Sequence, residues 1–265
     1  MNSVLSNGNK IYYTLRIAAA MCFIGHGCFG LIGKEIWCNY FAVFGVGHDM
    51  AFKLMPWLGC FDILMGLSLL IYPTRAVLWW LVVWGAFTAF LRPMSGEPFA
   101  EFIERAGNFG APAALLVLCS AKGNLFNGLF SLVKPGVQTS EATIVHVTNI
   151  LRVVVFLLLV GHGWLNLIEK KGLMGQYTAL GFSNPGQVAD NAGTFEIAAA
   201  CLLLIRSLRP VIFLLLIWKI GTELFYPHWE MFEWIERAGS FGSLLALWFI
   251  LPQSKAWAKS PQPAL

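Results

Sequence analysis

A stretch of ten residues in the first half of the chain returns almost unchanged in the second half. Residues 101–110 read EFIERAGNFG, and residues 233–242 read EWIERAGSFG. A copied segment of this kind indicates a tandem duplication. Each copy places two acids and an arginine in front of an apolar run. The feature that both copies keep is therefore a charged cluster at the beginning of an apolar helix.

Two further segments extend the repeat. Leu15-Arg16 and the Gly-His-Gly triplet at 25–27 recur at 151–152 and 161–163, an offset of 136. Phe61-Asp62-Ile63 recurs at 195–197 with an offset of 134, and the decapeptide recurs with an offset of 132. An offset that shrinks in steps is expected when short deletions fall in loops between helices of constant length. We predict two copies of one helical unit, residues 1–121 and 146–265, joined by a linker at 122–145 with an interfacial segment.

The composition places these units in a membrane. The chain is 57% hydrophobic and 12% charged, and its mean hydropathy is +0.67. Its apolar runs are about 17–22 residues long, which is the length needed to span a bilayer. Because a bilayer leaves no backbone group to be satisfied by water, these runs should be helices. We predict an all-α integral membrane protein with eight transmembrane helices, at about 15–32, 54–72, 75–92, 101–121, 146–168, 192–206, 210–226 and 233–251.

The basic residues predict the orientation. With the amino terminus inside, the inner side carries ten lysines and arginines against one acid, Glu141, and the other eight basic residues and thirteen acids fall outside. This positive-inside bias predicts cytoplasmic termini and a cytoplasmic linker. Each half has an even number of spans, so the two four-helix bundles should be parallel pseudo-repeats. The net charge of +4 then reflects topology, and we expect no nucleic-acid partner.

Polar groups on three helices of each half should lie at a similar depth, towards the outer face. A charged group at the bilayer centre costs roughly 2.5–3.5 kcal/mol on insertion scales, so these groups should face the bundle interior and pair. The predicted ligand-binding or ion-pair cluster comprises His26, Asp62, Glu101, Glu104, Arg105, His162, Glu196, Glu233, Glu236 and Arg237.

The seventh helix adds two charges that the first half lacks. Lys219 and Glu223 are four residues apart, where the first half has Gly85 and Ala89 at an offset of 134. The second half therefore has the richer set. If only one half keeps a working site, the sequence favours the second.

The cluster admits several interpretations. It could serve only to lock helix packing, it could be a hard-metal ligand set although no diagnostic spacing is present, or His26 and His162 could ligate one haem. A quinone head group or small anion near the outer interface fits the mixed polarity better. The tryptophans are expected to be interface anchors, with Trp79, Trp80 and Trp84 lining a ring-shaped ligand as the alternative. Six scattered cysteines predict free thiols, with a Cys38–Cys60 bridge as the alternative.

Some of these residues resemble a known family. Arg16, the Gly-His-Gly triplet at 25–27 and Asp62, together with their copies in the second half, resemble the DoxX-like membrane protein family, which is related to the membrane subunit of thiosulfate:quinone oxidoreductase. Its members are usually single four-helix units, whereas this chain has two. The resemblance implies a quinone-linked redox or accessory role in a bacterial inner membrane. It also implies other membrane or periplasmic subunits as partners, besides the lipid bilayer.

We therefore expect a membrane subunit of a quinone-linked oxidoreductase that binds a quinone or another small ligand near the outer face. The cofactor would be the quinone, with haem or a metal ion left open. One alternative is a non-catalytic structural or assembly subunit, because no complete redox centre can be read from the chain. The third candidate is a proton-coupled small-molecule transporter, which ranks last because the repeats show no obvious broken helices.

Overall fold

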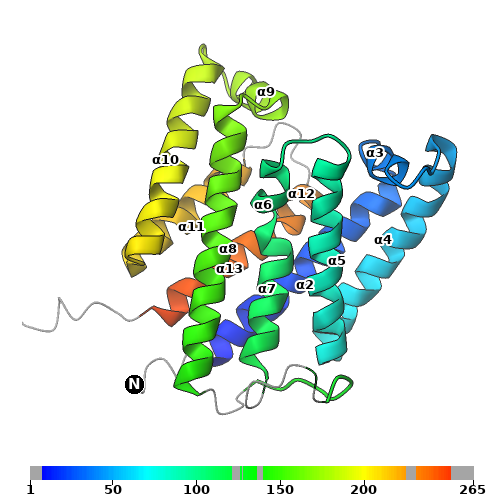
Figure 1. Cartoon of the computed structure of the whole chain (residues 1–265), viewed down its shortest axis with the longest axis vertical. Helices are drawn as coiled ribbons and strands as arrows, with labels where there is room; N and C mark the ends of the chain where they lie inside the picture. The colour runs from blue at the N-terminus through cyan, green and yellow to red at the C-terminus, as the bar shows by residue number, and fades with distance from the viewer. Residues whose placement is uncertain (1–7, 121–125, 127, 136–139, 225–230, 252–265) are drawn as a thin grey trace, which may run out of the picture.

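The chain is a bundle of helices whose long axes run roughly side by side (Figure 1). The computed structural model describes residues 8–120, 126, 128–135, 140–224 and 231–251. Within these ranges there is no β-strand, and an isolated bridge joins Thr74 and Leu132. The predicted all-α class is confirmed for this part of the chain.

Five of the described helices are long and apolar enough to cross a membrane. They are α2 (Gly8–Ile32), α4 (His48–Ile71), α5 (Arg75–Met94), α8 (Glu141–Leu167) and α10 (Pro185–Ile205). The sequence predicts that the sixth span begins near residue 192, but α10 begins earlier. Its first turn is stabilised by the Asn184 side chain, which accepts a hydrogen bond from the Gln187 amide, and by a proline at the first helical position.

The fourth and eighth predicted spans are each divided in two, which corrects the expectation of unbroken helices. The first consists of α6 (Ala100–Glu104) and α7 (Ala106–Leu118), and the second of α12 (Met231–Glu236) and α13 (Ala238–Ile250). The dividing residues are Arg105, with φ −89° and ψ 17°, and Arg237, with φ −77° and ψ 1°. Each break is therefore a local tightening of the helix at the arginine of the repeated decapeptide. The seventh span, α11 (Arg209–Leu224), is continuous.

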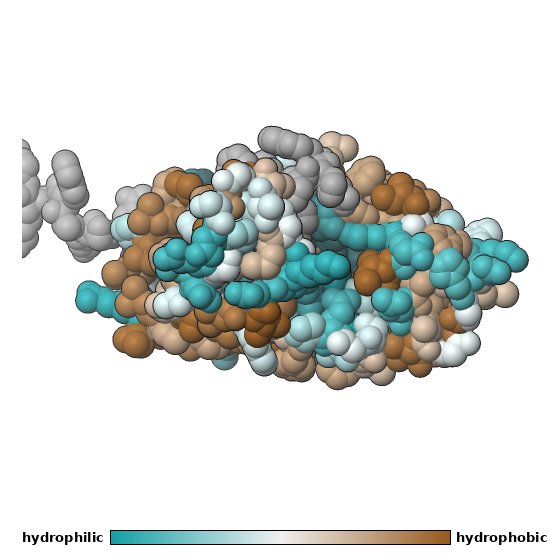
Figure 2. Space-filling model, turned by 90° about the horizontal axis from the view of Figure 1, so that it is seen from above, coloured by the Kyte–Doolittle hydropathy of each residue, from teal (hydrophilic) through white to brown (hydrophobic). Residues whose placement is uncertain are grey.

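Two short helices that the sequence analysis missed lie at one end of the bundle. They are α3 (Trp37–Ala42) and α9 (Lys171–Ala179), and each follows the first long helix of its half. With α6 and α12 they lie towards the top of Figure 1. Figure 2 looks onto this end and shows hydrophilic side chains gathered over it, with hydrophobic surface along the flanks. Apolar flanks and a polar end are the pattern of helices that stand in a bilayer.

The two halves of the sequence do not have separate cores. Helices α6 and α7 pack against α8, and α12 and α13 pack against α2. The largest cluster of buried apolar side chains runs from Ile11 in α2 to Ile250 in α13. The last helices of each half thus lie on the first helix of the other half.

Helices α7 and α13 meet at two glycines of the repeated decapeptide. A β-carbon added to Gly107 would lie 2.6 Å from the Ser240 amide nitrogen, and one added to Gly239 would lie 2.6 Å from the Gly107 carbonyl oxygen. Small residues let membrane helices approach at backbone distance. The contact between the halves therefore requires glycine at both positions.

The predicted linker is described only in part. Residues 121–125, 127 and 136–139 lie outside the described ranges, as do the termini at 1–7 and 252–265, for which the sequence predicts a cytoplasmic location. The sequence predicts the interfacial segment at residues 125–134, and its described residues 126 and 128–134 contain turns and no helix. The Val133 amide donates to the Pro73 carbonyl at 2.8 Å, and the Tyr12 hydroxyl donates to the Val133 carbonyl at 3.0 Å. These contacts hold the segment at the end of the bundle opposite α3 and α9 (Figure 1).

The glycine contact predicts a specific loss of stability. Gly107→Val should destabilise the protein by about 1–3 kcal/mol or more, because the added carbons overlap the α13 backbone. Gly172→Val in α9 is the matched control, since a β-carbon there meets nothing within 4 Å. The measurement is the thermal unfolding midpoint in detergent. Equal midpoints for the two variants would show that the halves do not meet at Gly107.

Candidate functional site

The twelve side chains of the predicted cluster all lie in the interior of the structure. Eight of them are buried and four are half-buried. The half-buried ones are His26, Arg105, Glu233 and Arg237. Ten of the twelve lie on α2, α4, α6, α8, α10, α11 and α12, and Arg105 and Arg237 stand directly after α6 and α12. The expectation that they face the bundle interior agrees with their burial.

In the first half, three helices contribute to one hydrogen-bonded chain. The His26 Nδ1 on α2 lies 2.8 Å from an Asp62 carboxylate oxygen on α4, and the Trp84 indole N–H on α5 donates to the other oxygen at 2.8 Å. Both oxygens of Asp62 therefore have partners, and the imidazole is held through one ring nitrogen. This leaves Nε2 of His26 available to a ligand.

The second half repeats this chain at the corresponding positions. The His162 Nδ1 on α8 lies 2.6 Å from Glu196 on α10, and the Trp218 indole N–H on α11 donates to the other oxygen of Glu196 at 2.8 Å. The offset between Trp84 and Trp218 is 134, the same as between Asp62 and Glu196. The recurring offset is a signal that could have identified Trp218 from the sequence.

The glycines beside each histidine bring the backbones together. A β-carbon on Gly25 would lie 2.5 Å from the Glu236 amide nitrogen on α12, and one on Gly27 would run into the Gly59 carbonyl on α4. Gly161 and Gly163 face α6 and α10 in the same way. In each Gly-His-Gly triplet, the first glycine therefore packs against a helix of the opposite half, and the second glycine packs against a helix of its own half. The histidine between them lies where the two halves meet.

The arginines of the decapeptides join the halves through one carboxylate. Arg105 lies 2.7 Å from Glu101 and 2.9 Å from Glu104, and Arg237 lies 3.0 Å from the second oxygen of Glu104. Arg237 also lies 2.7 Å from Glu223 on α11. The carboxylate of Glu104 thus has an arginine from each half, which compensates its burial.

Two lysines extend this network, and the sequence analysis missed both. Lys34, just after α2, pairs with Glu233 on α12, and Lys170, just before α9, pairs with Glu101 on α6. Each pair connects the end of the first helix of one half to the decapeptide of the other half. The two lysines are separated by 136 residues, the offset of the Gly-His-Gly triplets. That shared offset could have identified them.

The extra pair in the second half forms as its spacing predicts. The Lys219 ammonium lies 3.0 Å from Glu223, and the Lys219 side chain is fully buried. Because Arg237 also binds Glu223, this acid is neutralised on both sides. Lys219 and Glu223 are therefore committed to the ion-pair network.

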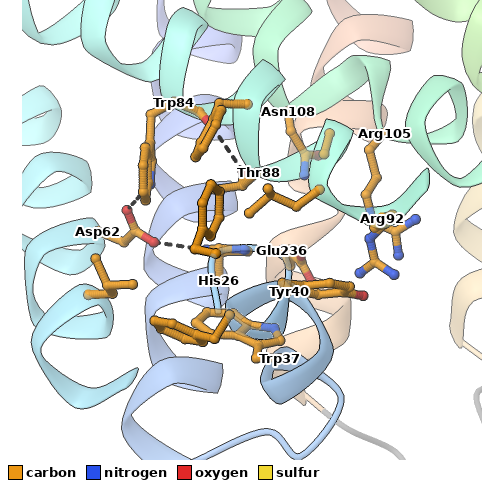
Figure 3. A pocket seen from close by; sticks show the side chains of 16 residues that line it. His26, Trp37, Tyr40, Asp62, Trp84, Thr88, Arg92, Arg105, Asn108 and Glu236 are labelled. Carbon is orange, nitrogen blue, oxygen red and sulfur yellow. Dashed lines mark hydrogen bonds and ion pairs between the residues drawn. The ribbon is translucent and has the colours of Figure 1, made fainter. Parts of the chain in front are cut away.

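The first half contains a cavity of about 230 Å³ beside His26 (Figure 3). Its walls are largely aromatic, with Trp37 tilted against the imidazole at a centroid distance of 4.6 Å. The polar groups that line it include His26, Arg92, Arg105, Asn108 and Glu236. An apolar pocket with a few convergent polar groups is the usual form of a small-molecule site.

Glu236 differs from its counterpart Glu104. Whereas Glu104 binds two arginines, Glu236 has no hydrogen bond or ion pair with any residue that the structure describes. Its side chain is buried and lines the cavity. In the view of Figure 3 it lies between His26 and the two arginines. A buried carboxyl group without such partners is stabilised when it binds a proton or accepts a hydrogen bond from a ligand.

One wall of this cavity comes from α3. The Tyr40 hydroxyl donates to Glu97 at 2.6 Å, and Arg92 lies 3.1 Å from the same carboxylate. Burial raises the pKa of Tyr40 above its ordinary value, the positive charge of Arg92 lowers it in part, and the hydrogen bond to Glu97 raises it again. Tyr40 is therefore protonated at neutral pH and keeps α3 tied to this wall.

A second cavity of about 390 Å³ lies at the corresponding place beside His162. Gly221 stands there in place of Phe87, so this cavity is roomier. Tyr177 on α9 donates to Asn166 at 2.6 Å, and burial followed by the negative charge of Glu196 raises the pKa of Tyr177 to about 12. The two cavities thus share a position and differ in shape and polarity.

Neither a metal ion nor a shared haem is favoured in the buried network. Donor atoms of Glu104, His162 and Glu223 lie within 4.8 Å of one another. However, Arg237 contacts both acids and Lys219 contacts Glu223, so a cation there would meet two positive charges. The two imidazoles line different cavities, so the geometry gives no support to one haem held by both.

The comparisons with known proteins found no matching protein-family model, no similar curated protein and no similar solved structure. The geometry of the site therefore carries the functional argument.

The shared position of Glu104 predicts a large effect of a small change. Glu104→Gln removes the buried charge between Arg105 and Arg237 and should destabilise the protein by about 3–5 kcal/mol, because two half-buried guanidinium groups lose their common partner. Asp190→Asn is the matched control, since Asp190 is exposed on α10. Thermal unfolding in nanodiscs measures both. A stable Glu104→Gln protein would mean that the network does not hold the halves together.

Proposed function

We propose that the chain is an integral membrane subunit of a quinone-linked oxidoreductase, similar to DoxX-like proteins, which binds a quinone head group in the cavity beside His26. In this proposal it has eight spans: the five long helices, α11, and the two broken pairs α6–α7 and α12–α13. The halves are parallel repeats, both termini are cytoplasmic, and the cavities lie towards the outer face of a bacterial inner membrane.

The proposal rests mainly on two groups at the cavity wall that can still form a hydrogen bond with a ligand. His26 uses Nδ1 for Asp62 and keeps Nε2 available, and the buried carboxyl of Glu236 is without a partner among the described residues. A flat ring with oxygen at opposite edges suits a space with aromatic walls and such groups. A quinone supplies two-electron, two-proton redox chemistry when it is bound.

The chain's own residues would bind the head group and exchange its protons. His26 would hold one ring oxygen, with Asp62 fixing the orientation of the imidazole and Trp84 fixing Asp62. Glu236 would take or give a proton at the same cavity. Trp37 and Tyr40 would exclude water from the cavity on the side covered by α3, because both lie on this helix and line the cavity.

The charge balance of the network supports proton exchange. Six lysines and arginines belong to it, namely Lys34, Arg92, Arg105, Lys170, Lys219 and Arg237. Seven described carboxylates form its ion pairs, namely Asp62, Glu97, Glu101, Glu104, Glu196, Glu223 and Glu233, and the carboxyl of Glu236 lines the cavity beside it as an eighth. Among these described residues the acids outnumber the bases by two, so two protons, carried by the imidazoles or by acids, would make this described part of the site neutral. A net charge is costly inside a protein that is surrounded by hydrocarbon. Binding of a charged or reduced ligand in the cavity should therefore be accompanied by the uptake or release of these protons.

The geometry favours the first half as the working site, although the sequence favours the second. The extra charges of the second half, Lys219 and Glu223, neutralise each other and Arg237. They are therefore less available to a ligand. In the first half, Ala89 lines the cavity at the position that corresponds to Glu223, and Glu236 keeps its binding capacity.

The first test is quinone binding by matched variants. A short-chain benzoquinone titrated into the protein in nanodiscs should quench tryptophan fluorescence, because Trp37 and Trp84 line the cavity. His26→Gln and Glu236→Gln should each weaken binding by about tenfold or more, since a hydrogen bond to a charged group contributes roughly 1.5–3 kcal/mol. Both variants should still insert and fold.

The control is Gly221→Phe, which places in the second cavity the aromatic ring that the first half already has. A β-carbon at Gly221 meets nothing within 4 Å, so the change should be tolerated and leave binding unaltered. If Gly221→Phe abolishes binding while His26→Gln does not, the second cavity is the site. Unaltered binding in all three variants would contradict the proposal.

Proton coupling gives an independent prediction. Binding of the same quinone, measured by calorimetry in buffers of different ionisation enthalpy, should be accompanied by proton uptake or release. Glu236→Gln should change the number of protons exchanged, because it removes the titratable group that faces the cavity without a partner. The same proton number for both proteins would exclude Glu236 from the exchange.

A proton-coupled transporter is the second candidate, and the breaks at Arg105 and Arg237 favour it. Helices interrupted at a charged site are typical of transporter binding sites. Uptake of a substrate into liposomes that depends on a proton gradient would support this candidate. A non-catalytic assembly subunit would instead co-purify with other polypeptides and bind no quinone.

A further inference from the structure

Three residues near the rim of the first cavity form a separate cluster of metal-ligating groups. Glu35 lies in the turn after α2, Cys38 is in the first turn of α3, and His48 is the first residue of α4. One donor atom from each residue lies within 4.8 Å of the other two. The His48 Nε2 is 2.8 Å from a Glu35 carboxylate oxygen. None of the three belongs to the buried ion-pair network.

We propose that Glu35, Cys38 and His48 bind Zn²⁺ or a divalent transition-metal ion of similar preference. Thiolate, imidazole and carboxylate are the ligand types of zinc, which binds them at about 2.0–2.3 Å. Donor atoms around a tetrahedral zinc ion are roughly 3.3–3.7 Å apart on these bond lengths. The three groups therefore need only small side-chain movements, and a water molecule takes the fourth position.

The surroundings of His48 support the assignment. An Asp49 carboxylate oxygen lies 3.7 Å from Nδ1, the ring nitrogen that does not face Glu35. Histidines that bind metals usually donate their other N–H to a carboxylate, and the Asp49 carboxylate would have to move closer than 3.7 Å to accept this bond and orient the ring. The Phe52 ring packs beside the imidazole at a centroid distance of 4.9 Å. The side chains of Glu35 and His48 are 76% and 59% exposed, so an ion can reach them from water.

The cluster belongs to the first half alone. At an offset of 136, the second half has Lys171, Met174 and Asn184 in place of the three ligands. A lysine and an amide do not make a zinc site, so the set is absent from the other copy. When the ion binds, the Cys38 thiol gives its proton to solvent as the S–Zn bond forms, and no redox change occurs.

The position of the ion would link two parts of the molecule. Cys38 is on α3, whose Trp37 and Tyr40 line the first cavity, and His48 begins α4, which carries Asp62. An ion held by both would fix α3 over the cavity. This site is independent of whether the cavity binds a quinone, so each can be tested without the other.

Co²⁺ is the probe for the test, because cobalt bound to a thiolate gives a charge-transfer absorption band that zinc does not. The full chain in nanodiscs should bind one equivalent of Co²⁺ with this band, and Zn²⁺ should abolish the band by displacement. Cys38→Ser should remove the band, and His48→Ala should weaken Co²⁺ binding at least tenfold. Asp49→Asn should weaken it by about tenfold through the ring orientation.

Cys60→Ser is the matched control, because Cys60 is a free and exposed thiol on α4, away from the cluster. It should leave the band unchanged. The proposal is overturned if the wild-type protein shows no charge-transfer band, if the band persists in Cys38→Ser, or if it is lost in Cys60→Ser. His48 and Asp49 are exposed, so their variants should fold and keep the thermal midpoint of the metal-free protein.

Discussion

The structure depends on the neutralisation of charges that have been placed inside an apolar bundle. A single buried charge is costly in hydrocarbon, and the cost falls only where an opposite charge and hydrogen bonds are already in position. Glu104 illustrates the solution, because its two carboxylate oxygens receive one arginine from each half of the chain. The two arginines therefore neutralise the Glu104 carboxylate, and their pairing with it links the two halves. The lysine pairs Lys34–Glu233 and Lys170–Glu101 repeat this on the two sides of the interface.

Such pairs require backbones that approach closely, which explains the glycines. Gly25 and Gly161 let α2 and α8 lie against the decapeptide helix of the other half, and Gly107 and Gly239 let the two decapeptides touch each other. The histidines stand between these contacts, where each is held by an acid of its own half. Packing and polarity are thus parts of one arrangement. A larger residue at a glycine would separate the charges that neutralise each other.

Much of this could be predicted from the sequence, and the rest has identifiable reasons. The repeat offsets singled out ten of the twelve cluster residues, because a residue kept in both copies has the same surroundings in each half, and the four-residue spacing of Lys219 and Glu223 added the other two. The breaks at Arg105 and Arg237 were missed, since hydropathy reports the length of an apolar run and not its local backbone. Helices α3 and α9 were missed because each is too short for a span, and Tyr40 was missed with them. Cys38 and Cys60 are free, as the simpler interpretation predicted.

Composition and repeat by themselves determined that the chain is α-helical and membrane-like and identified ten of the charged residues that gather in its interior, because these follow from solvation and from copied positions. The tertiary structure alone decided which acid pairs with which base. In the structure, Arg237 pairs with Glu104 and Glu223, and Glu236 has no partner among the described residues. The two decapeptides pair differently although their sequences are almost identical. The reason is physical: Glu223 on α11 offers Arg237 a carboxylate that Ala89 on α5 cannot offer Arg105. Pairing in a buried network depends on distances between helices that lie far apart in the sequence.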